Sequence, residues 1–299
     1  MKWLLISISF GISFVIIIGH YLPRLDQLQL TTIGIGSVPY IVFYLLQSLA
    51  FAISVPSVQK QDGIMISNVG YVINITIPFQ AGEALKVFFL KAFDVSLIKA
   101  TKIVVILRIL DLLVILTALV ISILIFYSLT LVLIFYILLG LVILFRFRLI
   151  DYSVLILHRI VSYLPGVDLL KLNFLKNPLS VVEDSKSLFS SRILLLKVLA
   201  WSANFLGFWL NFGVNFGSFE FNLLVFCMLT LGLTVIVTPL GVGQVQLTFQ
   251  GLMALLGHDV LPESMVLDLI SWQMSYVVGL ICITSISLGL RLIPRFLKD

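Results

Sequence analysis

The sequence predicts an all-α polytopic membrane protein, and three bulk properties support that fold class. Of the 299 residues, 61% are hydrophobic and only 11% are charged. A soluble domain carries about 25% charged residues. The mean hydropathy is +1.18. Because a water-soluble fold of this length would need far more polar surface, we expect lipid to be the solvent for most of the chain, which excludes a soluble enzyme.

Apolar runs divide the chain into about seven membrane spans, since a helix needs about 20 mostly apolar residues to cross the hydrocarbon. The first run follows Lys2 and is longer than the core of a typical signal peptide, so we interpret it as an uncleaved span. We treat the whole chain, 1–299, as one transmembrane domain. The expected spans are 3–19, 33–55, 103–127, 129–145, 193–214, 221–238 and 265–290.

Two further stretches, 63–90 and 239–257, are apolar but interrupted. In each, an apolar approach meets a break of proline and glycine and then a short helical pattern. Non-helical backbone at membrane depth is tolerated only where protein buries it or water reaches it. We therefore expect two re-entrant or broken helices.

Basic residues concentrate in 86–102, in 146–192 and in the tail after residue 290. The positive-inside rule places these segments and both termini in the cytoplasm. Within the cytoplasmic connection at about 148–191, residues 149–164 predict an amphipathic helix on the inner leaflet, with an extension of the preceding span as the alternative. The two broken helices then enter from opposite faces, which makes an inverted repeat a hypothesis.

The strongest local pattern is PFQAGEALK at residues 78–86. Proline and glycine break the approach and let a new helix begin. Glu83 and Lys86 are spaced i,i+3, so they share a face and can neutralise each other. Ionisable groups inside a membrane are candidates for function, and we assign both to substrate binding. The alternative is that Lys86 reaches the cytoplasmic surface and Glu83 only caps the helix.

Arg108 and Asp111 form a second candidate pair, inside the span 103–127. Their i,i+3 spacing again allows mutual compensation. Arg108 lies close to the expected cytoplasmic end, where its guanidinium can bind a lipid phosphate through two hydrogen bonds. We assign both residues to substrate binding. The alternative is a static ion pair that fixes helix packing.

The third pattern is PLGVGQVQ at 239–246, continued to Gln250. Its glycines, Gly241 and Gly243, allow close backbone approach, and Gln246 and Gln250 share one helical face. The N-terminus of a short helix presents free N–H groups that suit an anionic headgroup. We assign these four residues to substrate binding as well. Glycine-rich helix packing without a ligand is the alternative.

Metal and cofactor chemistry is not expected. The three histidines, His20, His158 and His258, are scattered without ligand spacing. Cys227 and Cys282 lie far apart inside apolar runs, which is typical of small core residues. No catalytic residues are assigned. The basic residues sit in short loops between apolar runs, so they indicate membrane orientation and no nucleic-acid partner.

Taken together, in their order and spacing, the three patterns resemble the transmembrane region of lysylphosphatidylglycerol synthases and its stand-alone flippase-like relatives. The resemblance implies a polytopic domain with two re-entrant regions that moves lipids between leaflets. Glu83, Arg108 and Asp111 fall on motif positions of that family. Two residues depart from it, because Leu107 and Gln246 stand where the family usually has acidic residues. For this reason the resemblance does not imply a proton- or cation-coupled role for Leu107 or Gln246.

We expect no synthase domain, since only nine residues follow Leu290. The expected function is a lipid flippase or translocase in the cell (cytoplasmic) membrane, and the chain is not expected to be an enzyme. Its expected cargo is an anionic lipid, either a modified phospholipid or a polyprenyl-phosphate-linked sugar. A separate synthase or glycosyltransferase is an expected partner. The alternatives are an accessory subunit and a membrane enzyme of lipid or lipid-linked glycan biosynthesis.

Overall fold

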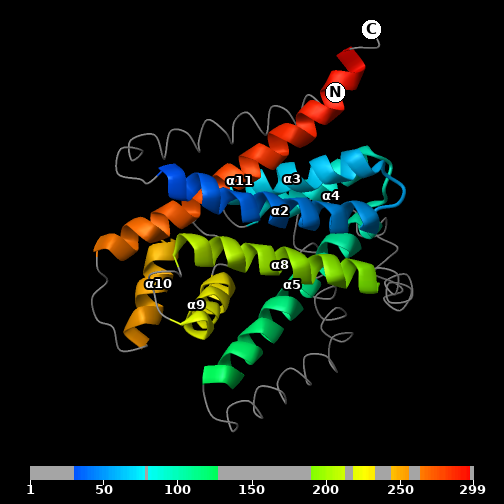
Figure 1. Cartoon of the computed structure of the whole chain (residues 1–299). Coiled ribbons are helices and arrows are strands. Elements are labelled where there is room, and N and C mark those ends of the chain that lie inside the picture. Colours follow the sequence, from blue (N-terminus) through cyan, green and yellow to red (C-terminus); the bar gives the residue numbers. More distant parts are fainter. Residues whose placement is uncertain are drawn as a thin grey trace, which may run out of the picture.

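The computed structural model describes residues 30–77, 80–126, 190–212, 218–232, 244–255 and 263–296, and most of these residues lie in helices (Figure 1). The helices are α2 (Leu30–Ser54), α3 (Lys60–Thr76), α4 (Ala81–Ala92), α5 (Leu97–Phe126), α8 (Ser191–Asn211), α9 (Phe219–Gly232), α10 (Gln244–Leu255) and α11 (Glu263–Phe296). The expected all-α fold class is confirmed.

Within the described ranges, four helices are long and apolar enough to cross a membrane. Their spanning stretches are Ile33–Ser54, Leu97–Leu124, Ser191–Asn211 and Asp268–Gly289. These stretches confirm four of the expected spans, at 33–55, 103–127, 193–214 and 265–290.

The other expected elements are described in part or not at all. Helix α9 is a shorter apolar helix that covers the first part of the expected span 221–238. The spans expected at 3–19 and 129–145 lie outside the described residues, as does the connection at 148–191.

Helices α2, α3, α8 and α11 run side by side, and α5 crosses them obliquely (Figure 1). Small residues let these helices approach closely. A Cβ added at Gly207 of α8 would lie 2.5 Å from the Tyr40 ring, and one at Gly279 of α11 would lie 2.6 Å from the Tyr40 Cβ. Because lipid chains are as apolar as leucine, such close packing is a main source of helix association in a membrane.

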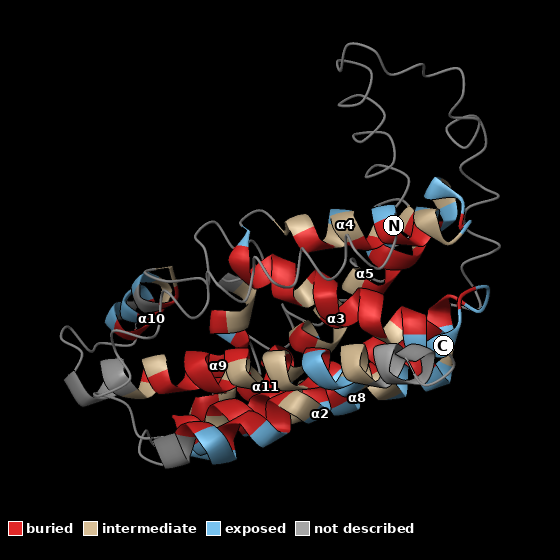
Figure 2. Cartoon of the chain, turned by 90° about the horizontal axis from the view of Figure 1, so that it is seen from above, coloured by how far each residue is buried: buried red, intermediate tan, exposed pale blue. Residues whose placement is uncertain are grey.

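Exposed and buried positions show the polarity expected of a protein in lipid. Exposed residues follow the outer faces of α2 and α8 (Figure 2). Large apolar side chains occupy many of these positions, namely Ile35, Val38, Val42, Leu45, Ile53, Leu194, Leu195, Val198, Leu199, Leu206 and Leu210. By contrast, Lys86, Asp111 and Lys197 are almost fully buried. Apolar groups therefore face outward and several charged groups face inward.

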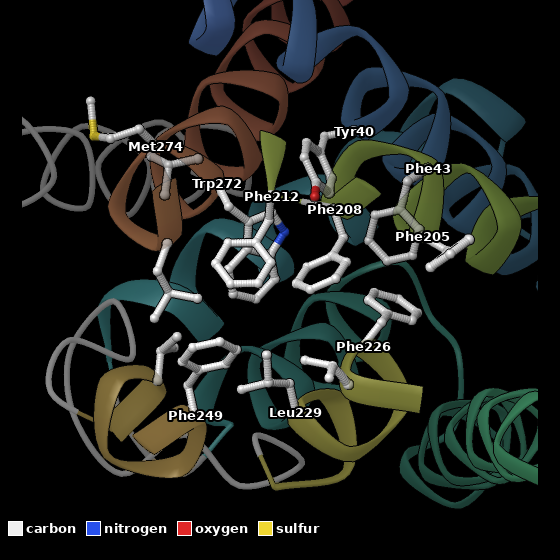
Figure 3. Packing of buried hydrophobic residues seen from close by; sticks show 14 of the residues in the cluster. Tyr40, Phe43, Phe205, Phe208, Phe212, Phe226, Leu229, Phe249, Trp272 and Met274 are labelled. Atoms are coloured by element: carbon white, nitrogen blue, oxygen red, sulfur yellow. The ribbon is translucent and has the colours of Figure 1, made fainter. Parts of the chain in front are cut away.

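An aromatic core joins α8 to α9, α10 and α11 (Figure 3). Phe208 of α8 has its ring centroid 5.5 Å from that of Phe226 in α9 and 5.5 Å from that of Trp272 in α11. Phe212 meets Phe249 of α10 edge to face, with centroids 5.0 Å apart. Such tilted and edge-to-face pairs are the favoured aromatic geometries. The core holds these four helices around one side of the cavity described below.

Helices α3 and α4 form an antiparallel hairpin. Asn74 of α3 lies against Glu83 of α4, and Gly70, one turn earlier on α3, lies against Lys86, one turn later on α4. At the break, Gln80 adopts a left-handed backbone with φ 55°, which is uncommon for a residue other than glycine. The expected break within 63–90 is confirmed.

Close contact between the two arms of the hairpin depends on glycine. A Cβ added at Gly82 would lie 1.8 Å from the carbonyl oxygen of Gly70, which no side chain can tolerate.

The second broken region shows only its short helix, α10, because its glycine-rich break lies outside the described residues. In Figure 1, α9 and α10 lie across α8 from α3 and α4. The inverted repeat stays a prediction.

Candidate functional site

Four side chains meet where the α3–α4 hairpin contacts α5, and we call them the Glu83 cluster: Asn74, Glu83, Lys86 and Arg108. The Glu83 Oε1 atom accepts a hydrogen bond from Asn74 Nδ2 at 2.8 Å and from Lys86 Nζ at 2.9 Å. It also accepts one from the Arg108 guanidinium. One carboxylate oxygen therefore holds groups from three helices.

Lys86 is buried within this cluster. Its side chain is 3% exposed, and its Nζ atom lies 3.6 Å from the centroid of the Tyr71 ring. A cation over an aromatic face is attracted by the ring's negative π surface. The expected Glu83–Lys86 pair is confirmed, and the alternative in which Lys86 reaches the surface is wrong. Glu83 does more than cap α4, because its carboxylate binds side chains of α3, α4 and α5.

One turn further along α5, Asp111 organises a second group, the Asp111 cluster: Gln47, Asp111, Lys197 and Trp201. Asp111 Oδ1 accepts from Gln47 Nε2 at 2.9 Å, from Lys197 Nζ at 2.9 Å and from Trp201 Nε1 at 2.8 Å. Asp111 Oδ2 accepts from Lys197 Nζ at 2.8 Å. This cluster joins α2, α5 and α8 through a buried ion pair.

The expected pairing of Arg108 with Asp111 is corrected by these contacts. Arg108 binds Glu83 of α4, whereas Asp111 binds Lys197 of α8. The i,i+3 spacing places both side chains on nearby faces of α5. Flanking helices nevertheless offer each of them an opposite charge at hydrogen-bonding distance. Each ion therefore ties α5 to a different neighbour.

Tyr71 of α3 connects the two clusters. Its hydroxyl donates to Gln47 Oε1 at 3.3 Å, and its ring lies beneath Lys86 Nζ. Gln47 Oε1 also accepts from Lys197 Nζ. A continuous polar network thus runs from the α3–α4 hairpin through α2 to α8.

A cavity of about 380 Å³ lies beside both clusters. Ligand pockets span roughly 300–1,000 Å³, so this one is at the small end of that range. Aromatic residues form much of its wall, namely Phe43, Tyr71, Trp201, Phe226, Trp272 and Tyr276. Its polar lining comprises Gln47, Asn74, Gln80, Arg108, Asp111, Asn204, Thr230 and Gln273. An apolar wall with a few convergent polar groups is the usual form of a small-molecule site.

Arg108 is the accessible cation of the two clusters. Its side chain is 34% exposed, whereas those of Lys86 and Lys197 are 3% and 2% exposed. The clusters contain three basic side chains and two carboxylates, so they carry one excess positive charge. A guanidinium in this setting suits an anion with several acceptor oxygens, such as a phosphate.

The predicted site residues fall into two groups. Glu83, Lys86, Arg108 and Asp111 come together beside the cavity as described. Gln250 lies at an exposed position on α10, a helix that contributes Val245 to the cavity wall. Gly241, Gly243 and the Gln246 side chain lie outside what the structure describes. Their substrate-binding roles stay predictions.

Several site residues were missed by the sequence analysis. Lys197 carried a signal, because an ionisable residue inside an apolar span is a functional candidate. Gln47, Trp201 and Asn204 carried none, since amides and tryptophans are common in membrane helices and only the fold brings these three to the cavity.

The sequence matches the family model of the lysylphosphatidylglycerol synthase TM region over residues 4–283. The chain belongs to this family. The match covers nearly the whole chain and confirms the resemblance drawn from the three patterns. Membership in the lysylphosphatidylglycerol synthase TM-region family, together with the apolar helices, makes the chain a multi-pass membrane protein of a lipid-biosynthetic, flippase-like family. Comparison with curated proteins and with solved structures finds no match.

Proposed function

We propose that the chain is a flippase that moves an anionic lipid across the cytoplasmic membrane, with its basic connections and both termini in the cytoplasm. The observation that carries the proposal is Arg108, a partly exposed guanidinium in an aromatic-walled cavity. The surrounding clusters leave one positive charge uncompensated. A lipid phosphate supplies the missing negative charge.

The residues around Arg108 hold it in place for this role. Glu83 binds the guanidinium, and Asn74 and Lys86 fix Glu83 in turn. A preorganised cation binds an anion without first having to be ordered, which favours affinity. The cavity of about 380 Å³ suits a headgroup, so the acyl chains stay in the surrounding lipid.

The contacts of the two acids favour a positioning role for them. Both oxygens of Asp111 already accept hydrogen bonds, and Glu83 Oε1 accepts three. The two carboxylates are therefore already engaged in holding cations of the same or neighbouring helices. We therefore propose no enzymatic activity for this chain, and a separate synthase or glycosyltransferase would supply the lipid.

Transport in proteoliposomes tests the proposal, with fluorescent anionic and zwitterionic lipids compared at equal protein density. Because a hydrogen bond to a charged group contributes about 1.5–3 kcal/mol, Arg108→Ala should slow transport of the anionic lipid roughly 10- to 100-fold. Arg108→Lys keeps the charge but loses the planar fork, so it should fall in between.

The matched control is Arg192→Ala, which removes an exposed arginine at the start of α8 and should leave transport unchanged. Folding of each variant is checked by its elution as a single species in detergent. Transport by Arg108→Ala at the wild-type rate, or wild-type protein that moves no anionic lipid, overturns the proposal.

A further inference from the structure

Asn204 of α8 is a buried amide without a hydrogen-bond partner among the described residues. The residue is 5% exposed and lines the cavity. Asn211, a buried asparagine on the same helix, behaves differently: its amide donates to the Gly207 carbonyl at 2.7 Å, and its Oδ1 atom accepts from the Ser275 hydroxyl at 2.7 Å. Buried polar groups nearly always have a partner. The amide of Asn204 is therefore available to a ligand in the cavity.

The charges around the cavity disfavour a cationic headgroup. Asp111 is the acidic residue in the described cavity lining, and both of its oxygens are occupied by Gln47, Lys197 and Trp201. Glu83, behind Arg108, already binds two cations. An ammonium group would meet the charge of Arg108 and find no free carboxylate among these residues.

The neutral polar lining matches hydroxyl groups instead. Gln80, Asn204, Thr230 and Gln273 contribute amides and a hydroxyl to the cavity. Amide side chains both donate and accept hydrogen bonds, as a hydroxyl does, whereas an ammonium only donates and a phosphate oxygen only accepts. A ligand with several hydroxyls can use the donor and the acceptor of Asn204 together.

We infer that the transported lipid carries an uncharged polyhydroxyl headgroup, such as a sugar, inositol or glycerol, on its phosphate, and that Asn204 binds the hydroxyls while Arg108 binds the phosphate. This inference rests on the proposed flippase function. It excludes amine-bearing headgroups, such as an aminoacyl group, from the preferred cargo.

The test compares lipids that differ in one property at a time. Phosphatidylglycerol and phosphatidylethanol both carry a singly charged phosphodiester, but only the first has headgroup hydroxyls. Phosphatidylinositol adds further hydroxyls, and lysylphosphatidylglycerol adds amines. With wild-type protein in proteoliposomes, we expect the hydroxyl-bearing anionic lipids to move at least about fivefold faster than phosphatidylethanol or the lysyl lipid.

Variants of Asn204 then assign the preference to this residue. Asn204→Leu keeps a similar size without hydrogen bonding and should remove the preference, so the ratio of the phosphatidylglycerol rate to the phosphatidylethanol rate should fall to about one. Asn204→Ser keeps a donor and an acceptor and should retain part of the preference. Ser202→Ala, at an exposed position on the same helix, is the control and should change nothing.

The outcomes separate the two proposals. Equal rates for phosphatidylglycerol and phosphatidylethanol, or faster movement of the lysyl lipid, overturn the inference but leave the flippase intact. A preference that survives Asn204→Leu shows that other residues read the hydroxyls and also overturns it. If no lipid moves faster than in protein-free vesicles, the proposed function itself fails.

Discussion

The Glu83 and Asp111 clusters lie one turn apart on α5, yet they differ in charge balance and accessibility. In the Asp111 cluster one carboxylate faces one ammonium, and their side chains are 6% and 2% exposed. In the Glu83 cluster one carboxylate faces two cations, and the Arg108 side chain is 34% exposed. The first cluster is buried and balanced in charge, whereas the second carries one excess positive charge and has a partly exposed cation.

Under the proposed function, this difference separates a structural role from a binding role on the same helix. A buried ion pair is costly to desolvate, but breaking it is worse, because one charge is then left uncompensated. The pair of Asp111 and Lys197 therefore fixes α5 against α8. Arg108 lies on a helix that this pair already fixes, which is the support that its proposed phosphate-binding role needs.

The largest expected effect comes from breaking the Asp111 cluster. Lys197→Met leaves the Asp111 carboxylate buried without its cation, which should lower the free energy of unfolding by about 3–5 kcal/mol. The free energy of unfolding is measured in mixed micelles by titration with a denaturing detergent. Adding Asp111→Asn to Lys197→Met removes the stranded charge and should recover most of the loss. A double variant as unstable as the single one would contradict the role of the ion pair.

A smaller effect is expected from separating the arms of the hairpin that carries Glu83. Gly82→Ala forces a methyl group into the Gly70 carbonyl, so it should cost about 1–3 kcal/mol, as overpacking does. It should also slow transport, since Glu83 moves away from Arg108. Gly251→Ala is the control, because a Cβ there meets nothing within 4 Å. That change should stabilise α10 by about 0.5–1 kcal/mol. Equal effects of the two changes on stability would contradict the close crossing.

The smallest expected effect comes from removing one donor of the Asp111 cluster. Trp201→Phe deletes the N–H group that binds Asp111 Oδ1 but keeps most of the ring. Asp111 retains Gln47 and Lys197, so the loss should be about 1 kcal/mol. Trp209→Phe deletes an N–H group that has no hydrogen-bond partner among the described residues and should cost less. The same unfolding titration measures both, and a larger loss for Trp209→Phe would reverse the interpretation.

The sequence was sufficient to predict the fold class and one of the two expected ion pairs, that of Glu83 with Lys86. Apolar length predicted the helices, because the thickness of a bilayer sets that length. The i,i+3 spacing predicted the contact of Glu83 with Lys86, since α4 is a single helix and no tertiary partner displaces Lys86. These features depend on local spacing, which a sequence displays directly.

Contacts between distant helices could not be predicted in the same way. The spacing of Arg108 and Asp111 is identical to that of Glu83 and Lys86, yet both residues bind other helices. Which helices lie side by side depends on tertiary packing, and a single sequence gives no distances between helices. Asn204 illustrates this further, because only the cavity distinguishes it from Asn211 on the same helix.

The contact between Asp111 and Lys197 also has a consequence for the order of synthesis. The two residues are 86 positions apart, and ribosomes add about 5–20 residues per second. Asp111 is therefore made roughly 4 to 17 seconds before Lys197. During that interval Arg108, one turn away on the same nascent helix, is the nearest opposite charge in sequence. The i,i+3 spacing therefore offers Asp111 a nearby cation before Lys197 is made, whereas in the finished structure Asp111 binds Lys197 and Arg108 binds Glu83.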